Sequence, residues 1–211
     1  MKFYLEITLL PNSEVDTNFI LSKTFQQLHL GLVEIKDPQN QSPIGISFPE
    51  YFSNEKGGIF GSKIRLFAKD ESTLTKFDAA KWLSRLSDYV HCTNIRAVPE
   101  KLKGYAIYQR QQPKTNKERL ARRYAKRHNM DYDMALNVKV FKKFGASHDD
   151  EPELSYNSME HKTITTPFIR LKSLSGSREF YLWIKKISAT NPLNSTYSTY
   201  GLSSKSTVPE F

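Results

Sequence analysis

The histidines are the first candidates for chemistry, because imidazole is the side chain that exchanges a proton most readily near neutral pH. None has a partner at the HxH or HxxxH spacing of a metal site, and the chain lacks a Walker loop and a dinucleotide-binding fingerprint. The five are His29, His91, His128, His148 and His161. A reaction on RNA is open without a metal, because the substrate's own 2′-hydroxyl becomes a nucleophile once a base removes its proton. His29 suits that role, although its place at a helix edge is also compatible with no chemical role.

The segment from Lys114 to His128 is strongly basic. Seven of its fifteen residues are Lys or Arg, and Glu118 is its one acidic residue. Thr115 followed three residues later by Glu118 predicts a capping-box start, and a helix is expected over 115–128. At about 100° per residue, cations share one side of this helix and apolar residues the other. The two sets are Arg119, Arg122, Arg123, Lys126 and Arg127, and Leu120, Ala121, Tyr124 and Ala125.

Charge is distributed unevenly along the chain. The formal net charge is +9: residues 1–100 hold 11 basic and 12 acidic residues, a net of −1, and residues 101–211 hold 20 and 10, a net of +10. This asymmetry favours a nucleic-acid partner for the second half. Surface charge that only keeps the protein soluble is the competing interpretation.

Cysteine usage and the N-terminus bear on the compartment. Cys92 is the only cysteine, which excludes an internal disulfide and any CxxC pair. The first ten residues contain Glu6 and do not form a signal peptide, and no apolar run is long enough to cross a bilayer. We therefore expect a cytoplasmic protein without a membrane anchor.

The first hundred residues show the pattern of a ferredoxin-like βαββαβ domain within an α+β protein. Alternating apolar residues predict strands, and apolar residues at helical spacing predict helices. The expected elements are a strand at Lys2–Leu9, a helix at Asp16–Val33, strands at Ile44–Phe48 and Lys63–Ala68, a helix at Ser72–Ser87 that a break can divide in two, and a strand at Asn94–Val98. A glycine-rich connection through Gly57, Gly58 and Gly61 separates the two middle strands.

The remaining residues predict a smaller α+β domain over 104–211, after a linker at Pro99–Gly104. It contains the basic helix 115–128, a second helix from Asp131 to about Val140, an acidic loop from Ala146 to Glu160 and a β-hairpin at 167–187.

The hairpin allows its register to be predicted. Gly176 and Ser177 fit a two-residue turn that needs glycine first. That turn pairs residues whose numbers sum to 353 and places them on one face. The expected pairs are Ser175 with Arg178, Ser173 with Phe180, Leu171 with Leu182, and Ile169 with Ile184.

Several segments in both halves together resemble the type I-F CRISPR-associated endoribonucleases that process precursor CRISPR RNA, the f branch of the Cas-six family, also called Csy-four. They are FQQLH ending at His29, GISFP at Gly45–Pro49, NKERLARRYAKRH at Asn116–His128, PFIRLKS with EFYLWI in the hairpin, and YGLS at Tyr200–Ser203. Each segment alone is unspecific, and the combination carries the resemblance.

The resemblance implies roles for individual residues. His29 matches the family's general base, Ser173 the serine that holds the reacting hydroxyl or sugar, and Tyr200 the tyrosine that orients the histidine. Phe180 matches the ring that stacks on the end of the RNA stem. The remaining residues expected to bind RNA are Arg110 and Gln112, which match a pair that reads base edges, together with Lys114, Arg119, Arg122, Arg123, Lys126, Arg127 and Ser175.

The resemblance also implies a function. Cleavage of CRISPR repeat hairpins would use no metal or other cofactor, leave a 2′,3′-cyclic phosphate, and be followed by retention of the product with other subunits of a type I-F surveillance complex. Three features depart from the family pattern: Lys126 in place of the more usual arginine, the loop 146–160, and Glu210 where an aromatic residue is more familiar. Lysine at 126 offers a point charge rather than a bidentate contact.

Two other functions remain open on the sequence alone. One is a non-catalytic scaffold that binds an RNA hairpin within a ribonucleoprotein complex, which the charge of the second half would also explain. The other is a general basic protein that binds DNA or an acidic protein surface.

Overall fold

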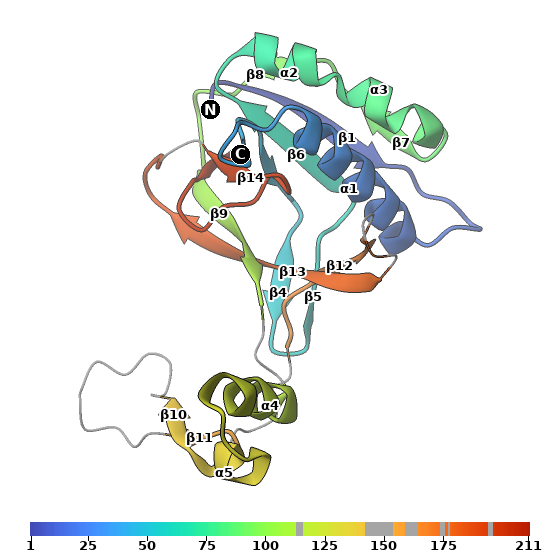
Figure 1. Cartoon of the computed structure of the whole chain (residues 1–211). Coiled ribbons are helices and arrows are strands. Elements are labelled where there is room, and N and C mark those ends of the chain that lie inside the picture. The colour runs from blue at the N-terminus through green and yellow to red at the C-terminus, as the bar shows by residue number, and fades with distance from the viewer. Residues whose placement is uncertain (113–115, 142–153, 159–163, 174–175, 177, 194–195) are drawn as a thin grey trace. The chain divides into compact units, whose positions relative to one another are not determined.

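The structure is a computed structural model of the whole chain (Figure 1). It describes residues 1–112, 116–141, 154–158, 164–173, 176, 178–193 and 196–211. The fold is α+β, with antiparallel sheets and few helices, as the sequence predicts. Among the residues described, no helix is both long and apolar enough to span a membrane.

Contacts group the chain into two compact units. One contains Met1–Gln111 and Thr165–Phe211, and the other contains Gln112–Ile164. This grouping differs from the expected division at 100–104. The reason is that the strands after residue 104 and the hairpin share one apolar core with the first hundred residues, as Ala106 and Leu182 do with Leu5.

The first sheet of the larger unit has the strand order β3-β6-β1-β7, and every pairing in it is antiparallel. Its strands are β1 (Phe3–Leu9), β3 (Gly45–Ser47), β6 (Lys63–Ala68) and β7 (Val90–Cys92), with β8 (Arg96–Ala97) also paired to β1. Leu5, Ile7 and Leu9 are buried along β1, which confirms the predicted alternation. The apolar pattern does not predict β7, whose three residues are too few to show a period.

Two helical segments pack beside each other in this unit. Helix α1 (Thr17–Glu34) begins where Asp16 accepts hydrogen bonds from the backbone N–H groups of Asn18 and Phe19. The left-handed Asp78 divides the second segment in two, into α2 (Glu71–Phe77) and α3 (Ala79–Leu83), followed by the 3₁₀ turn η1 (Ser84–Leu86). Gly31 allows the close approach, because a Cβ there would lie 2.7 Å from both Phe77 and Trp82.

The second sheet of the larger unit has the order β12-β13-β9-β15 (Figure 1). Its strands are β9 (Gly104–Gln111), β12 (Phe168–Lys172), β13 (Glu179–Ala189) and β15 (Val208–Glu210). Two short strand pairs complete the unit: β2 (Gln41–Ser42) with β14 (Tyr197–Ser198), and β4 (Phe52–Asn54) with β5 (Gly57–Ile59). The expected glycine-rich connection is therefore itself part of a hairpin.

The predicted register of the β12–β13 hairpin is wrong by two residues. Leu171 pairs with Phe180, and the Ser173 N–H donates to the Arg178 carbonyl at 2.8 Å, so the connection spans four residues rather than two. Ser173 therefore lies opposite Arg178, not opposite Phe180. A shift of two leaves the same side chains on each face, so the apolar pattern could not distinguish the two registers.

The C-terminal residues are held by polar contacts. Glu210 forms an ion pair with Lys186 at 2.6 Å and accepts a hydrogen bond from the Tyr108 hydroxyl at 3.0 Å. The guanidinium of Arg65 lies 4.0 Å from the centre of the Phe211 ring. Glu210 therefore links β15 to β9 and β13.

The smaller unit contains α4 (Lys117–His128), α5 (Tyr132–Asn137), β10 (Lys139–Phe141) and β11 (Leu154–Ser155). The N-cap of α4 is Asn116, whose side chain accepts from the Arg119 N–H at 2.7 Å. The expected cap at Thr115 is therefore wrong, and Thr115 lies outside the described residues. The predicted second helix ends at Asn137 instead of Val140. Most of the predicted loop 146–160 lies outside the described residues, and its described part includes β11.

Candidate active site

His29 lies on the last turns of α1 and is half-buried. Its Nδ1 atom is 2.7 Å from the backbone carbonyl oxygen of Thr199. A carbonyl only accepts hydrogen bonds, so Nδ1 carries the proton and donates it to this oxygen. In the neutral ring the lone pair is therefore on Nε2, the atom that is available to accept a proton from a substrate.

A stack of aromatic rings fixes the plane of the imidazole. The Tyr200 ring lies parallel to it, with the two centroids 4.0 Å apart and the planes 7° apart. The buried Phe25 ring, one helical turn before His29, is parallel to Tyr200 at a centroid distance of 6.4 Å. Tyr200 thus connects the imidazole to the core, and its hydroxyl makes no hydrogen bond that the described residues show.

The turn from Ser198 to Leu202 presents both the Thr199 carbonyl and the Tyr200 ring. The Gly201 N–H donates to the Ser198 carbonyl and the Ser198 N–H donates to the Leu202 carbonyl, each at 2.8 Å. Gly201 has φ +67°, and a Cβ there would lie 2.4 Å from the buried Ile46 side chain. Glycine is required at this position on both counts.

The surroundings favour the neutral form of both rings. Burial lowers the pKa of His29 below its usual 6.5, and the hydrogen bond to Thr199 opposes this shift only in part. Burial raises the pKa of Tyr200, while the positive charge of Arg110 acts in the opposite direction. At neutral pH the imidazole is thus able to act as a base and the phenol keeps its proton.

Helix α1, which carries His29, packs on β12, the strand that Ser173 follows. The Ser22 hydroxyl donates to the Arg170 carbonyl, and the Gln26 side-chain amide donates to the Lys172 carbonyl at 3.4 Å. Helix and strand therefore advance in the same direction. Ser173 follows β12 by one residue, and His29 follows Gln26 by three.

Two further predicted residues lie on the face of the second sheet that covers the core. Arg110 follows the buried Ala106 and Tyr108 at alternate positions of β9 and is exposed, and its charge acts on Tyr200. Phe180 is half-buried on β13 and packs against the core. The larger unit therefore brings together His29, Tyr200 and Arg110, and it also contains Ser173, directly after β12, and Phe180, on β13. Gln112 is exposed and belongs to the smaller unit.

In the smaller unit, α4 has the two faces that its sequence predicts. Ala121 and Ala125 are buried, and Tyr124 stacks on His128 and packs against Tyr156. The opposite face is exposed and consists of the predicted cations Arg119, Arg122, Arg123, Lys126 and Arg127.

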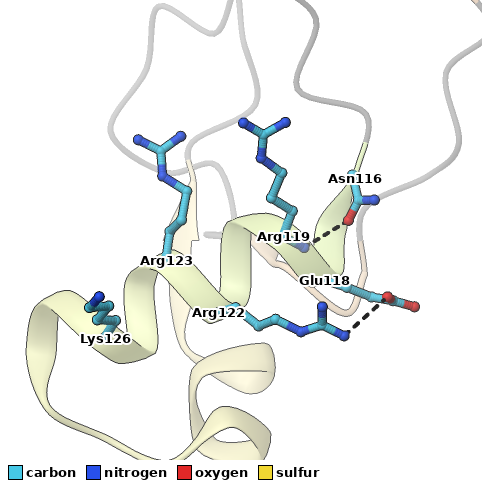
Figure 2. A pocket seen from close by; sticks show the side chains of 6 residues that line it. All are labelled: Asn116, Glu118, Arg119, Arg122, Arg123 and Lys126. Atoms are coloured by element: carbon cyan, nitrogen blue, oxygen red, sulfur yellow. Dashed lines mark hydrogen bonds and ion pairs between the residues drawn. The ribbon is translucent and has the colours of Figure 1, made fainter. Parts of the chain in front are cut away.

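A surface pocket of about 420 Å³ lies along the exposed face of α4 (Figure 2). Its lining residues are Asn116, Glu118, Arg119, Arg122, Arg123 and Lys126. Figure 2 shows Arg119 and Arg123 extending in the same direction, while Arg122 turns to Glu118 with a nitrogen–oxygen distance of 3.7 Å. Within the described part of the chain, Arg119, Arg123 and Lys126 have no ion-pair partner. Their charge is available to an anionic ligand.

Lys114 and Ser175, both predicted to bind RNA, lie outside the described residues. No group of three or more His, Cys, Asp and Glu side chains that could hold a metal occurs among the residues described. Sequence reasoning missed Phe25 and the Thr199 carbonyl. The spacing of four residues between Phe25 and His29 places both on one helix face and was a usable signal, whereas a backbone carbonyl has none.

The family model for CRISPR-associated protein (Cas_Csy4) matches residues 4–211. The chain belongs to the Cas_Csy4 family. Two similar proteins carry the name CRISPR-associated endonuclease Cas6/Csy4. The one from Escherichia coli (strain UTI89 / UPEC) is 30% identical over 212 residues, and the one from Pseudomonas aeruginosa (strain UCBPP-PA14) is 29% identical over 216 residues; each alignment covers all of both chains. The Cas_Csy4 match includes His29, the turn that holds it and the basic helix.

Proposed function

We propose that this Cas_Csy4 protein is an endoribonuclease that cleaves precursor CRISPR RNA at the repeat hairpin. The observation that carries the proposal is the neutral, oriented imidazole of His29 in a chain whose full-length relatives are named as endonucleases. The ferredoxin-like assignment of the region around β1 belongs to the same proposal. Its support is the strand order β3-β6-β1-β7 with α1 and α2 as the connecting helices.

In the proposed reaction, Nε2 of His29 takes the proton of a 2′-hydroxyl. The 2′-oxygen attacks the adjacent phosphorus, and the bond from phosphorus to the 5′-oxygen breaks. The departing 5′-oxygen takes up a proton from water and the imidazolium later releases its proton to water, so the products end in a 2′,3′-cyclic phosphate and a 5′-hydroxyl. Ser173 holds the reacting sugar, and Tyr200 keeps the imidazole in plane. The base is a side chain and the nucleophile belongs to the substrate, so the proposed steps use no metal.

In this proposal the RNA is recognised by cations and rings other than the residues that take part in cleavage. Arg119, Arg123 and Lys126 bind the phosphates of the stem, and Arg122 and Arg127 extend the same surface. Arg110 and Gln112 read base edges, and Phe180 stacks on the end of the stem. Lys114 and Ser175 complete the proposed set. The cleaved hairpin stays bound, and other subunits of a type I-F surveillance complex assemble with it.

The test uses the repeat RNA of the protein's own CRISPR array in excess chelator. We expect a single cut and a product that carries a 2′,3′-cyclic phosphate by mass spectrometry. A 2′-deoxy substitution at the cut nucleotide should stop cleavage and leave binding intact, whereas the same substitution one nucleotide away should not. A cut that requires added metal, or one that persists at the 2′-deoxy position, would refute the mechanism.

A non-catalytic RNA scaffold is the second candidate. One observation favours it: the exposed cations of α4 belong to a compact unit separate from the one that holds His29. Tight binding of the repeat hairpin, with the RNA recovered uncut at neutral pH, would select the scaffold over the nuclease.

A further inference from the structure

The outer face of the four-stranded sheet, opposite the face on the core, exposes a cluster of aromatic rings. Phe168, Tyr181 and Trp183 alternate along β12 and β13 with buried residues such as Ile169 and Leu182. Phe168 is 46% exposed and Tyr181 is 54% exposed, and Trp183 is half-buried. A contiguous group of exposed rings on a stable sheet is a common sign of a binding surface.

Phe168 contacts the other two rings, so the three form one platform. The Phe168 centroid lies 4.9 Å from that of Tyr181 and 4.6 Å from that of Trp183, and Phe168 is directly opposite Trp183 in the strand register. Both rings that contact Phe168 belong to the neighbouring strand β13. A preorganised platform loses little conformational entropy when a ligand binds.

Basic side chains flank the rings on the same face. Lys185 follows Trp183 on β13, and Arg170 and Lys172 follow Phe168 on β12. Arg170 is paired with Glu179, whereas Lys172 and Lys185 have no ion-pair partner among the residues described. These three cations and one anion together carry a net charge of +2.

Amide side chains occupy the neighbouring strand. Gln109 lies opposite Lys185, and Gln111 lies opposite Trp183, both on β9. The Gln111 side-chain oxygen accepts a hydrogen bond from the Thr166 hydroxyl at 2.8 Å, so its NH₂ group is the part considered for base edges. Amides both donate and accept hydrogen bonds, which suits the polar edges of nucleobases. Rings, cations and amides thus share one face of three adjacent strands, β12, β13 and β9.

This combination favours single-stranded RNA over a protein partner. Unpaired bases stack on exposed rings, and lysines beside the rings neutralise the phosphates between the bases. A protein interface with aromatic anchors is depleted of charge at its centre, because unpaired cations buried there are costly. Here cations stand next to the rings at both ends of the cluster.

We propose that the outer face, defined by Phe168, Tyr181, Trp183 and Lys185, binds unpaired RNA. This role goes beyond the proposed function, which concerns the binding and cleavage of a base-paired hairpin. His29 belongs to α1, which packs on the core side of the sheet. The outer face is therefore a separate site from that of His29. RNA that continues past a hairpin is one source of such a strand, and a free single strand is another.

The test measures the affinity of the full chain for a short fluorescent oligouridylate, which forms no hairpin. The double variant Tyr181→Ala/Trp183→Ala should bind it at least about fivefold more weakly, the minimum expected when one base can no longer stack. Tyr181→Phe keeps the ring and should bind as the wild type does. Phe52→Ala, which removes a 56% exposed ring from β4, is the matched control and should have no effect.

A second variant removes charge without touching the rings. Lys172→Ala/Lys185→Ala should weaken oligouridylate binding and lower its salt slope by about 0.7 for each phosphate that is no longer neutralised. It keeps the proposal testable if the ring variant does not fold. A repeat hairpin with a single-stranded extension should bind more tightly than the bare hairpin, and the ring variant should cancel that difference.

Several results would overturn the inference. They are no binding of oligouridylate by the wild type, equal binding by the ring variant, or concentration-dependent dimers in sedimentation that the ring variant abolishes, which would assign the face to a second copy. Cleavage of the bare hairpin is measured on the same preparations. Absence of the ring effect with intact cleavage refutes only this inference, and intact ring dependence without cleavage refutes only the proposed function.

Discussion

The imidazole of His29 lies flat against the ring of Tyr200, with the centroids 4.0 Å apart and the planes 7° apart. The residue before Tyr200 supplies the carbonyl that receives the Nδ1 proton. One short turn therefore sets both the plane and the tautomer of the histidine. This arrangement leaves Nε2 as the basic atom, and the first three predictions follow from it.

Replacement of His29 by alanine should abolish most cleavage and spare RNA binding. General-base catalysis contributes about 10²- to 10⁴-fold, and the cations proposed to bind the stem lie on other residues. Single-turnover cleavage and hairpin affinity should be measured on the same protein. His91→Ala, which removes an exposed histidine of β7, is the control and should cleave normally. Normal cleavage by His29→Ala would exclude it as the base.

Tyr200→Phe should retain most of the cleavage rate, and Tyr200→Ala should lose about two- to tenfold. The contact with His29 is made by the ring, and such a pair is worth about 0.5–1.5 kcal/mol. Single-turnover rates at saturating protein separate this effect from binding. An equal decrease in both variants would mean that the hydroxyl, rather than the ring, is what matters.

The cleavage rate should rise with pH and level off with a midpoint below 6.5, because burial lowers the pKa of His29. The stability of the folded protein should also increase with pH over this range. The unfolded chain binds the proton more readily than the folded one, so this contribution is complete above 6.5 and is lost as pH falls toward the folded pKa. NMR titration of the imidazole in the folded protein checks that its pKa lies below that of the unfolded chain. A midpoint above 6.5 would contradict the burial argument.

Arg123→Ala should weaken hairpin binding and lower the salt slope by about 0.7 to 0.9, the value for one phosphate that is no longer neutralised. The side chain is exposed on α4 and has no ion-pair partner within the described residues. Arg96→Ala removes the same charge from exposed β8 and should change the slope much less. Equal slopes for wild type and Arg123→Ala would mean that Arg123 does not touch phosphate.

Asn116→Ala should destabilise α4 by about 1 kcal/mol, whereas Asn116→Ser should be close to neutral because serine also caps helices. The Asn116 side chain accepts the Arg119 N–H at 2.7 Å, and alanine cannot. Amide exchange of the first helical turn reports the difference, with roughly fivefold faster exchange expected for alanine. The same exchange rate in both variants would place the cap elsewhere.

Much of the fold could be predicted because it follows from local periodicity. The alternation in β1, the apolar stripe of α1 and the two faces of α4 each depend on residues a few positions apart. Local patterns failed where several arrangements satisfy them equally. The predicted hairpin register is wrong by two because both registers bury Ile169 and Leu182, and the predicted cap at Thr115 is wrong because Asn116 caps equally well.

The sequence by itself determined which chemical groups are present: one histidine in a family-like segment, a helix with a cationic face, and a chain that belongs to the Cas_Csy4 family. Only the tertiary structure decided the state of the histidine. The contact of His29 with Thr199 joins residues 170 positions apart and uses a backbone carbonyl, which every residue carries. Residue types cannot report such a contact. The tautomer and the lowered pKa arise only when folding buries the ring beside that oxygen.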